Sequence, residues 1–128
     1  MPEEVFYVYE PVKKYQINLR ERLINFAVST MKFLATLPNS KEFDVYRYQI
    51  SKAAHSIGAN YDEAQGAYSK ADFTAKIGIC LKEARETNFF YTVLNRLIQD
   101  EILLHLLKES NEIRKIFGKI MVKLRTNT

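Results

Sequence analysis

The side chains in this sequence best suited to chemistry cluster in the run Lys82-Glu83-Ala84-Arg85-Glu86-Thr87. In a helix, Glu83 and Glu86 share one side because residues three and four apart are neighbours. Asn60 and Glu63 share a side of an earlier helical stretch by the same rule. Paired carboxylates on two helices can transfer protons or bind a metal ion. They can equally form a structural network of hydrogen bonds and salt bridges between the helices, and we favour this network.

The sequence lacks the ligand spacing with which helical bundles bind metal ions. Di-iron bundles need a Glu-x-x-His pair on each of two helices, with further Glu ligands. The two histidines, His55 and His105, do not lie three residues after a Glu, so we predict surface or interface positions for both. No Ser or Cys has a recognisable partner base, and no glycine-rich phosphate loop is present. We therefore predict a protein that is not an enzyme, without catalytic residues, metal or cofactor.

Positive charge is concentrated at the C-terminal end of the sequence. Residues 1–110 carry 14 basic and 14 acidic side chains, so the whole net charge of +4 lies in residues 111–128. The basic residues there are Arg114, Lys115, Lys119, Lys123 and Arg125. The three lysines are spaced by four, so they line one outward edge of a helix. Such an edge is a candidate nucleic-acid-binding surface, although basic residues also stabilise a helix C-terminus.

Apolar residues recur at three- and four-residue spacing in four stretches, which predicts four helices. The first helix is expected over residues 12–35 and ends before Pro38. The second is expected to begin at Asn39 or Ser40 and to end before a turn at residues 66–68. The third is expected to begin at the cap Ser69 and to end near residues 99–100. The fourth is expected over residues 101–124. Short connections then imply an all-α, antiparallel up-down four-helix bundle.

Two small residues are informative about packing and environment. Gly58 lies mid-helix, where it costs about 1 kcal/mol relative to alanine, so we expect a local bend or a close approach to another backbone. The single cysteine, Cys80, lies in an apolar stripe and is expected in the core. A lone thiol, the absence of a long apolar run and an N-terminus unlike a signal peptide predict a cytoplasmic protein without a membrane partner.

The aromatic residues predict apolar surface beyond one bundle core. Residues 1–11 are expected to form an extended N-terminal arm ahead of a bundle domain over residues 12–128, and Val5 to Tyr9 are all apolar. Residues 89–91 are three consecutive aromatics, and about 100° per residue prevents one interior from burying all three. We therefore expect another copy or a partner protein to cover them. The candidate oligomer interface comprises Phe6, Tyr7, Tyr9, Phe89 and Phe90.

Between Gln49 and Leu94 the sequence resembles the four-helix-bundle family that includes proteins encoded in intervening sequences of bacterial 23S ribosomal RNA genes. The resemblance consists of polar residues that are identical to those of the family and that follow the family's order and spacing. It rests on Ser56-Ile57-Gly58-Ala59-Asn60, Glu63-Ala64, Ser69, Asp72-Phe73, Lys76 and Lys82-Glu83-Ala84-Arg85-Glu86-Thr87. The departures affect local packing. Lys52 replaces the usual Arg, Ala54-His55 replaces a Gly-Thr pair, and Phe90-Tyr91 replaces a Trp-Leu pair.

The resemblance implies properties that the residues alone do not. Members of this family are left-handed up-down bundles that assemble into rings, often pentamers. Relatives serve as accessory subunits of retroelement reverse transcriptases and bind nucleic acid through a basic surface. Asn60, Glu63, Glu83 and Glu86 match shared polar residues that determine fold or assembly, and no catalytic residue carries over. We expect a non-catalytic homo-oligomer, a pentameric ring, that binds RNA or another nucleic acid. The alternative is an adaptor or accessory subunit for a larger nucleic-acid enzyme.

Overall fold

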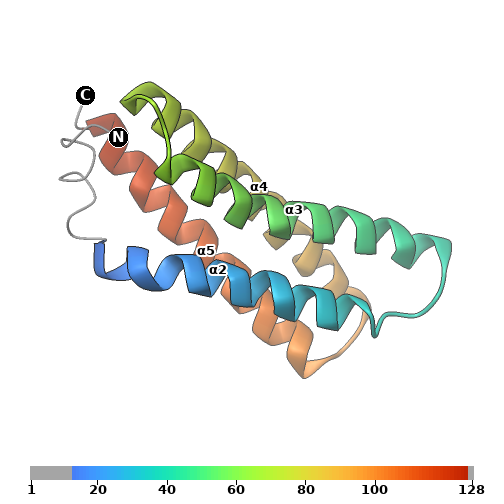
Figure 1. Cartoon of the computed structure of the whole chain (residues 1–128). Coiled ribbons are helices and arrows are strands. Elements are labelled where there is room, and N and C mark those ends of the chain that lie inside the picture. The colour runs from blue at the N-terminus through green and yellow to red at the C-terminus, as the bar shows by residue number, and fades with distance from the viewer. Residues whose placement is uncertain (1–12, 127–128) are drawn as a thin grey trace.

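A computed structural model describes the backbone of residues 13–126 and the side chains of residues 19–126, which form an antiparallel bundle of four helices (Figure 1). The helices are α2 (Lys13–Leu34), α3 (Lys41–Gln65), α4 (Lys70–Leu97) and α5 (Glu101–Thr126). The predicted all-α bundle is confirmed, with helix ends within about two residues of expectation. The predicted arm, with Phe6, Tyr7 and Tyr9, lies outside the described residues.

Polar side chains begin the helices where the sequence indicated. Ser40 Oγ accepts a hydrogen bond from Phe43 N at 3.2 Å, and Ser69 Oγ accepts one from Asp72 N at 3.0 Å. Asp72 Oδ2 in turn accepts from Tyr68 N at 3.3 Å, which ties the preceding turn to α4. These bonds satisfy backbone N–H groups that have no partner within the helix. Both predicted N-caps are therefore confirmed.

The core follows the apolar stripes of the four helices, and Tyr91 lies at its centre. The Tyr91 ring is fully buried and meets the Phe26 ring edge to face, with 6.2 Å between centroids. Its hydroxyl donates to Thr30 Oγ1 at 2.8 Å, so a polar bond joins α4 to α2 within an apolar interior. Because a buried hydroxyl without a partner is costly, this bond favours one alignment of the two helices.

Helix α4 packs extensively against both α3 and α5, whereas α2 and α5 make the fewest contacts of the neighbouring pairs. The helices thus lie in the order α2, α3, α4, α5 around the bundle, and the α2–α3 pair is opposite the α4–α5 pair (Figure 1). None of the described helices combines the length and the apolar character that a membrane span requires.

One of the two alternatives expected for Gly58, a close approach to another backbone, is not found. A Cβ atom added there would meet Leu23 Cβ at 3.6 Å, which is an ordinary van der Waals contact. The glycine is half-buried, and it faces a groove between α2 and α3. Its effect is to deepen this groove rather than to bring two helix backbones together.

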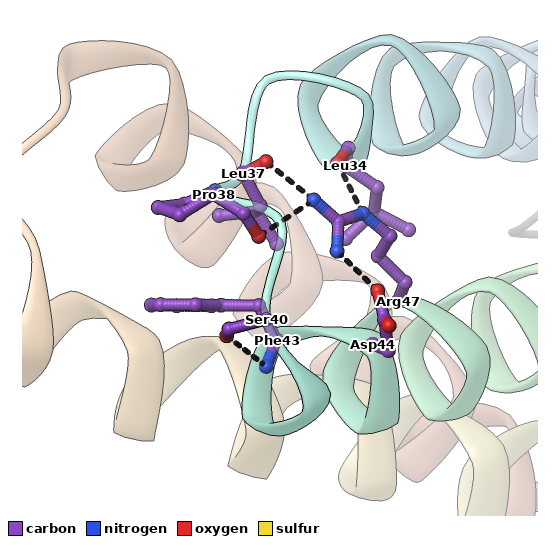
Figure 2. A network of polar contacts seen from close by, with 7 residues as sticks. All are labelled: Leu34, Leu37, Pro38, Ser40, Phe43, Asp44 and Arg47. Atoms are coloured by element: carbon purple, nitrogen blue, oxygen red, sulfur yellow. Dashed lines mark hydrogen bonds and ion pairs between the residues drawn. The ribbon is translucent and has the colours of Figure 1, made fainter.

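Arg47 organises the connection between α2 and α3, which the sequence did not indicate (Figure 2). Its Nε donates to Leu34 O at 3.2 Å, and its Nη2 donates to the carbonyls of Leu37 and Pro38. Its Nη1 bonds Asp44 Oδ1 at 2.7 Å, which holds the guanidinium in place. Carbonyls at the end of a helix have no partner within it. One planar side chain from α3 therefore satisfies the end of α2 and the following turn.

Arg47→Ala is expected to lower the free energy of unfolding by about 2 kcal/mol, because it removes hydrogen bonds from a charged donor to these carbonyls. The free energy of unfolding of Arg47→Lys should lie between those of the wild type and Arg47→Ala, since an ammonium keeps the charge but lacks the planar fork. Chemical denaturation measures both changes. Equal stability of all three proteins would contradict this role for Arg47.

Candidate nucleic-acid interface

A groove of about 680 Å³ runs between α4 and α5 and is lined by positive charge. Its lining residues are Leu81, Arg85, Lys115, Gly118, Lys119, Met121, Val122, Lys123 and Arg125. Five of these are basic and none is acidic. Clefts lined by one sign of charge focus the electric field and concentrate counter-ions. The groove therefore has the charge of a polyanion-binding site.

The spacing of the lysines on α5 produces one wall of this groove. Lys115, Lys119 and Lys123 are four residues apart, and each step advances about 6 Å along the helix. Phe117, Ile120 and Leu124 alternate with them and are buried, which anchors the opposite face of α5 in the core. A Cβ placed at Gly118, between the first two lysines, would meet no atom of another helix within 4 Å and would face open space.

Three of these cations, Arg85, Lys115 and Lys119, are not neutralised by a buried carboxylate. Lys115 Nζ lies 3.8 Å from Glu112 Oε1, and more than half of each of these side chains is exposed. Such an exposed pair contributes little stability. Within the described part of the chain, Arg85 and Lys119 make no ion pair. Arg85, Lys115 and Lys119 are therefore available to a polyanion without first breaking a buried salt bridge.

The groove contains four of the five predicted basic residues and one that was missed. Arg114 does not line it, and its Nη2 donates to Asn111 Oδ1 of its own helix at 2.7 Å. Arg85 lines the opposite wall from α4. The sequence analysis treated Arg85 only as part of the polar run from Lys82 to Thr87. Its position four residues after Leu81, which is buried, was a signal that Arg85 lies beside the neighbouring helix.

The four predicted network residues do not form the expected bonds between helices. Asn60 Nδ2 donates to Ser56 O at 2.8 Å, within its own helix. Among the described side chains, no hydrogen bond or ion pair joins Asn60, Glu63, Glu83 and Glu86. Burial raises the pKa of Glu83, and the neighbouring carboxylate of Glu86 raises it further. Like charges at this spacing repel, so Glu83 and Glu86 are a mutually repelling pair on α4 rather than members of a bonded network.

The histidines and the cysteine offer no metal centre or nucleophile. His55 and His105 are both exposed, and His55 Nδ1 lies 2.7 Å from Ser51 O of its own helix. The structure groups no three His, Cys, Asp or Glu side chains suited to a metal in the part it describes. Cys80 is buried as predicted, with Sγ 3.4 Å from Ile57 O, and burial raises the pKa of its thiol to about 12. The thiol is therefore protonated and unreactive at neutral pH.

The three consecutive aromatics divide as helical rotation predicts. Tyr91 is fully buried, whereas Phe89 is 64% exposed. Phe90 is half-buried and meets the Tyr46 ring of α3 edge to face at 5.8 Å. Of the two described members of the predicted oligomer interface, Phe89 is thus available to another molecule and Phe90 belongs mainly to the bundle.

A second groove, between α2 and α3, is mainly apolar. It has a volume of about 550 Å³, and Ile24, Val28 and Met31 line it while each remains 40–47% exposed. The ion pair of Arg20 with Asp62, at 2.9 Å, lies along the same groove. Contiguous exposed apolar residues with polar neighbours are typical of protein-interaction sites.

Glu86→Gln is expected to lower the pKa of Glu83, because it removes the neighbouring negative charge that opposes ionisation of Glu83. Carbon-13 NMR titration of the glutamate carboxyls measures the shift. Glu42→Gln, in the first turn of α3, is the matched control and should leave the Glu83 titration unchanged. An unchanged Glu83 pKa in Glu86→Gln would contradict the like-charge interaction.

The comparisons with known proteins agree with the sequence resemblance. A model of the 23S rRNA-intervening sequence protein family matches residues 16–119. A solved structure, described as a protein of unknown function from the S23 ribosomal protein family of Bacteroides thetaiotaomicron, shares 36% identity with the chain. The match covers 80% of this chain and 96% of the other, with a TM-score of 0.72. No curated protein matches the chain.

Proposed function

Because the chain belongs to the family of 23S rRNA-intervening sequence proteins, we propose that it is a non-catalytic bundle that binds RNA or another nucleic acid through the α4–α5 groove. The observation that carries this proposal is the charge of the groove, with five basic side chains and no acidic one. The solved relative is described as a protein of unknown function, and neither comparison names a catalytic activity.

The groove suits contacts to phosphates rather than to bases. Lysine ammonium groups act as point charges on flexible stems, whereas the guanidinium forks of Arg85 and Arg125 match phosphate oxygens. Phosphate contacts carry no direct sequence information. The chain is therefore expected to bind nucleic acid with weak sequence preference and with an affinity that falls steeply as salt rises.

We further propose that several copies assemble into a ring, a pentamer. A ring uses two different faces of each copy. The apolar α2–α3 groove supplies one face, and the exposed Phe89 marks another. Because the α2–α3 pair is opposite the α4–α5 pair, a contact made through the α2–α3 groove does not cover the basic groove of the same copy. Several copies of one weak site then give a high combined affinity.

A second candidate function uses the same apolar surface. The exposed Ile24, Val28 and Met31 could receive a different protein, and the chain would then act as an adaptor or accessory subunit for a larger nucleic-acid enzyme. The two functions differ in what occupies the α2–α3 groove. A stoichiometric protein partner that remains after nuclease treatment favours the adaptor, whereas self-association of the purified chain favours the ring.

Lys119→Glu combined with Lys123→Glu is expected to weaken RNA binding at least tenfold, because two attractive phosphate contacts become repulsive. Fluorescence anisotropy with a labelled structured RNA at several salt concentrations measures the change. The matched control combines Lys41→Glu and Lys108→Glu, which alters net charge equally at exposed sites outside the groove. Equal weakening by both pairs, or binding insensitive to salt, would contradict a role for the groove.

Light scattering coupled to size exclusion is expected to give a mass near five times that of the 15.0 kDa chain. Val28→Asp should shift this mass to that of one chain, because it places a charge in the apolar contact. Val28 is 46% exposed, so the isolated bundle should tolerate the change and keep its helical circular dichroism. A wild-type chain that is monomeric at all concentrations would contradict the ring.

A further inference from the structure

Tyr68, in the turn between α3 and α4, is 97% exposed and is the most exposed large apolar side chain in the described part of the chain. The other exposed apolar side chains retain between 40% and 64% of their accessibility. They flank grooves or helix faces, whereas the Tyr68 ring projects from a turn and is not packed against the bundle. Neither the core nor a groove accounts for an aromatic residue at this position.

The backbone that carries Tyr68 is held on both sides. Gly66 N donates to Glu63 O at 3.0 Å, and Ala67 N donates to Ala64 O at 3.1 Å, so the turn continues the end of α3. Ala67 is buried, and Tyr68 N donates to Asp72 Oδ2 at 3.3 Å. A tyrosine has only two side-chain torsions to fix, so a ring on an anchored backbone loses little entropy on binding.

The antiparallel arrangement places this ring at the end of the bundle toward which the basic groove runs. Gly78 of α4 lies opposite Met121 of α5, where an added Cβ would be 4.0 Å from Met121 Cε. Counting 1.5 Å per residue from that crossing, Lys70 at the start of α4 and Arg125 lie within about 10 Å of each other along the bundle axis, and Tyr68 is two residues before Lys70. Figure 1 shows the α3–α4 connection at the same end as the C-terminus of α5.

We propose that Tyr68 stacks on an unpaired base of a nucleic-acid strand whose phosphates lie in the α4–α5 groove, an inference that rests on the proposed function. Aromatic side chains beside a cationic groove are how proteins bind single strands without reading sequence. In a duplex the base faces are covered by neighbouring base pairs, so the ring has no face to contact. The site therefore prefers single-stranded or looped segments to continuous duplex.

Two probes of equal charge isolate the stacking contribution: a labelled oligoadenylate of about twelve nucleotides and an abasic oligomer of the same length. Tyr68→Ala should weaken oligoadenylate binding about tenfold, the loss expected for one stacked base, and leave abasic binding unchanged. Tyr68→Phe keeps the aromatic face and should bind both probes like the wild type. Because the ring is exposed, none of these changes should unfold the bundle.

The chain contains no tryptophan, so Tyr68→Trp introduces a single fluorescent reporter at the site. Its emission should be quenched by oligoadenylate and unaffected by the abasic oligomer. Oligoadenylate binding that is lost with Lys119→Glu plus Lys123→Glu but unaltered by Tyr68→Ala would overturn the stacking inference and leave the proposed function standing. Emission already blue-shifted in the free protein would also overturn it, since another copy would then cover the ring. A wild-type chain that binds the structured RNA but neither probe would also overturn the stacking inference alone, whereas one that binds none of the three would overturn both proposals.

Discussion

The packing of α4 against α5 is the contact on which the proposed site depends. The buried faces of these helices fix their rotation, so the lysines of α5 and Arg85 of α4 face the same outward groove. Asn88 Nδ2 donates to Ser110 Oγ at 3.1 Å, which adds one directional bond between the two helices. If α5 rotated by one residue, about 100°, apolar side chains would be exposed and the basic row would turn away from α4. The buried core therefore determines the direction in which the basic side chains of the groove point.

Local sequence signals predicted the features that arise within one helix. Ser69 and Asp72 identified the start of α4 because capping is a bond between near neighbours. Residues 89–91 point respectively to solvent, to the contact with α3 and to the core, because helical rotation alone decides their directions. The row of Lys115, Lys119 and Lys123 was visible for the same reason. Each of these predictions needed only the 3.6-residue period and the chemistry of a few adjacent side chains.

Features that depend on a second helix were beyond that reasoning. Arg47 reaches carbonyls at the end of the preceding helix, and no sequence period shows which carbonyls lie within its reach. Arg85 joins the basic groove only because α5 lies beside α4. The expected bonds among Asn60, Glu63, Glu83 and Glu86 failed for a related reason. Sharing a side of a helix does not bring two side chains from different helices to hydrogen-bond distance.

Lysine protection mapped by mass spectrometry tests the central claim most directly, because it reports where nucleic acid lies on the folded chain. The protein would be acetylated at low salt with and without bound RNA, and the modification of each lysine compared. The account predicts that RNA protects Lys115, Lys119 and Lys123 and leaves Lys41 and Lys108 reactive. Equal protection of all these lysines, or protection confined to sites outside the α4–α5 groove, would contradict it.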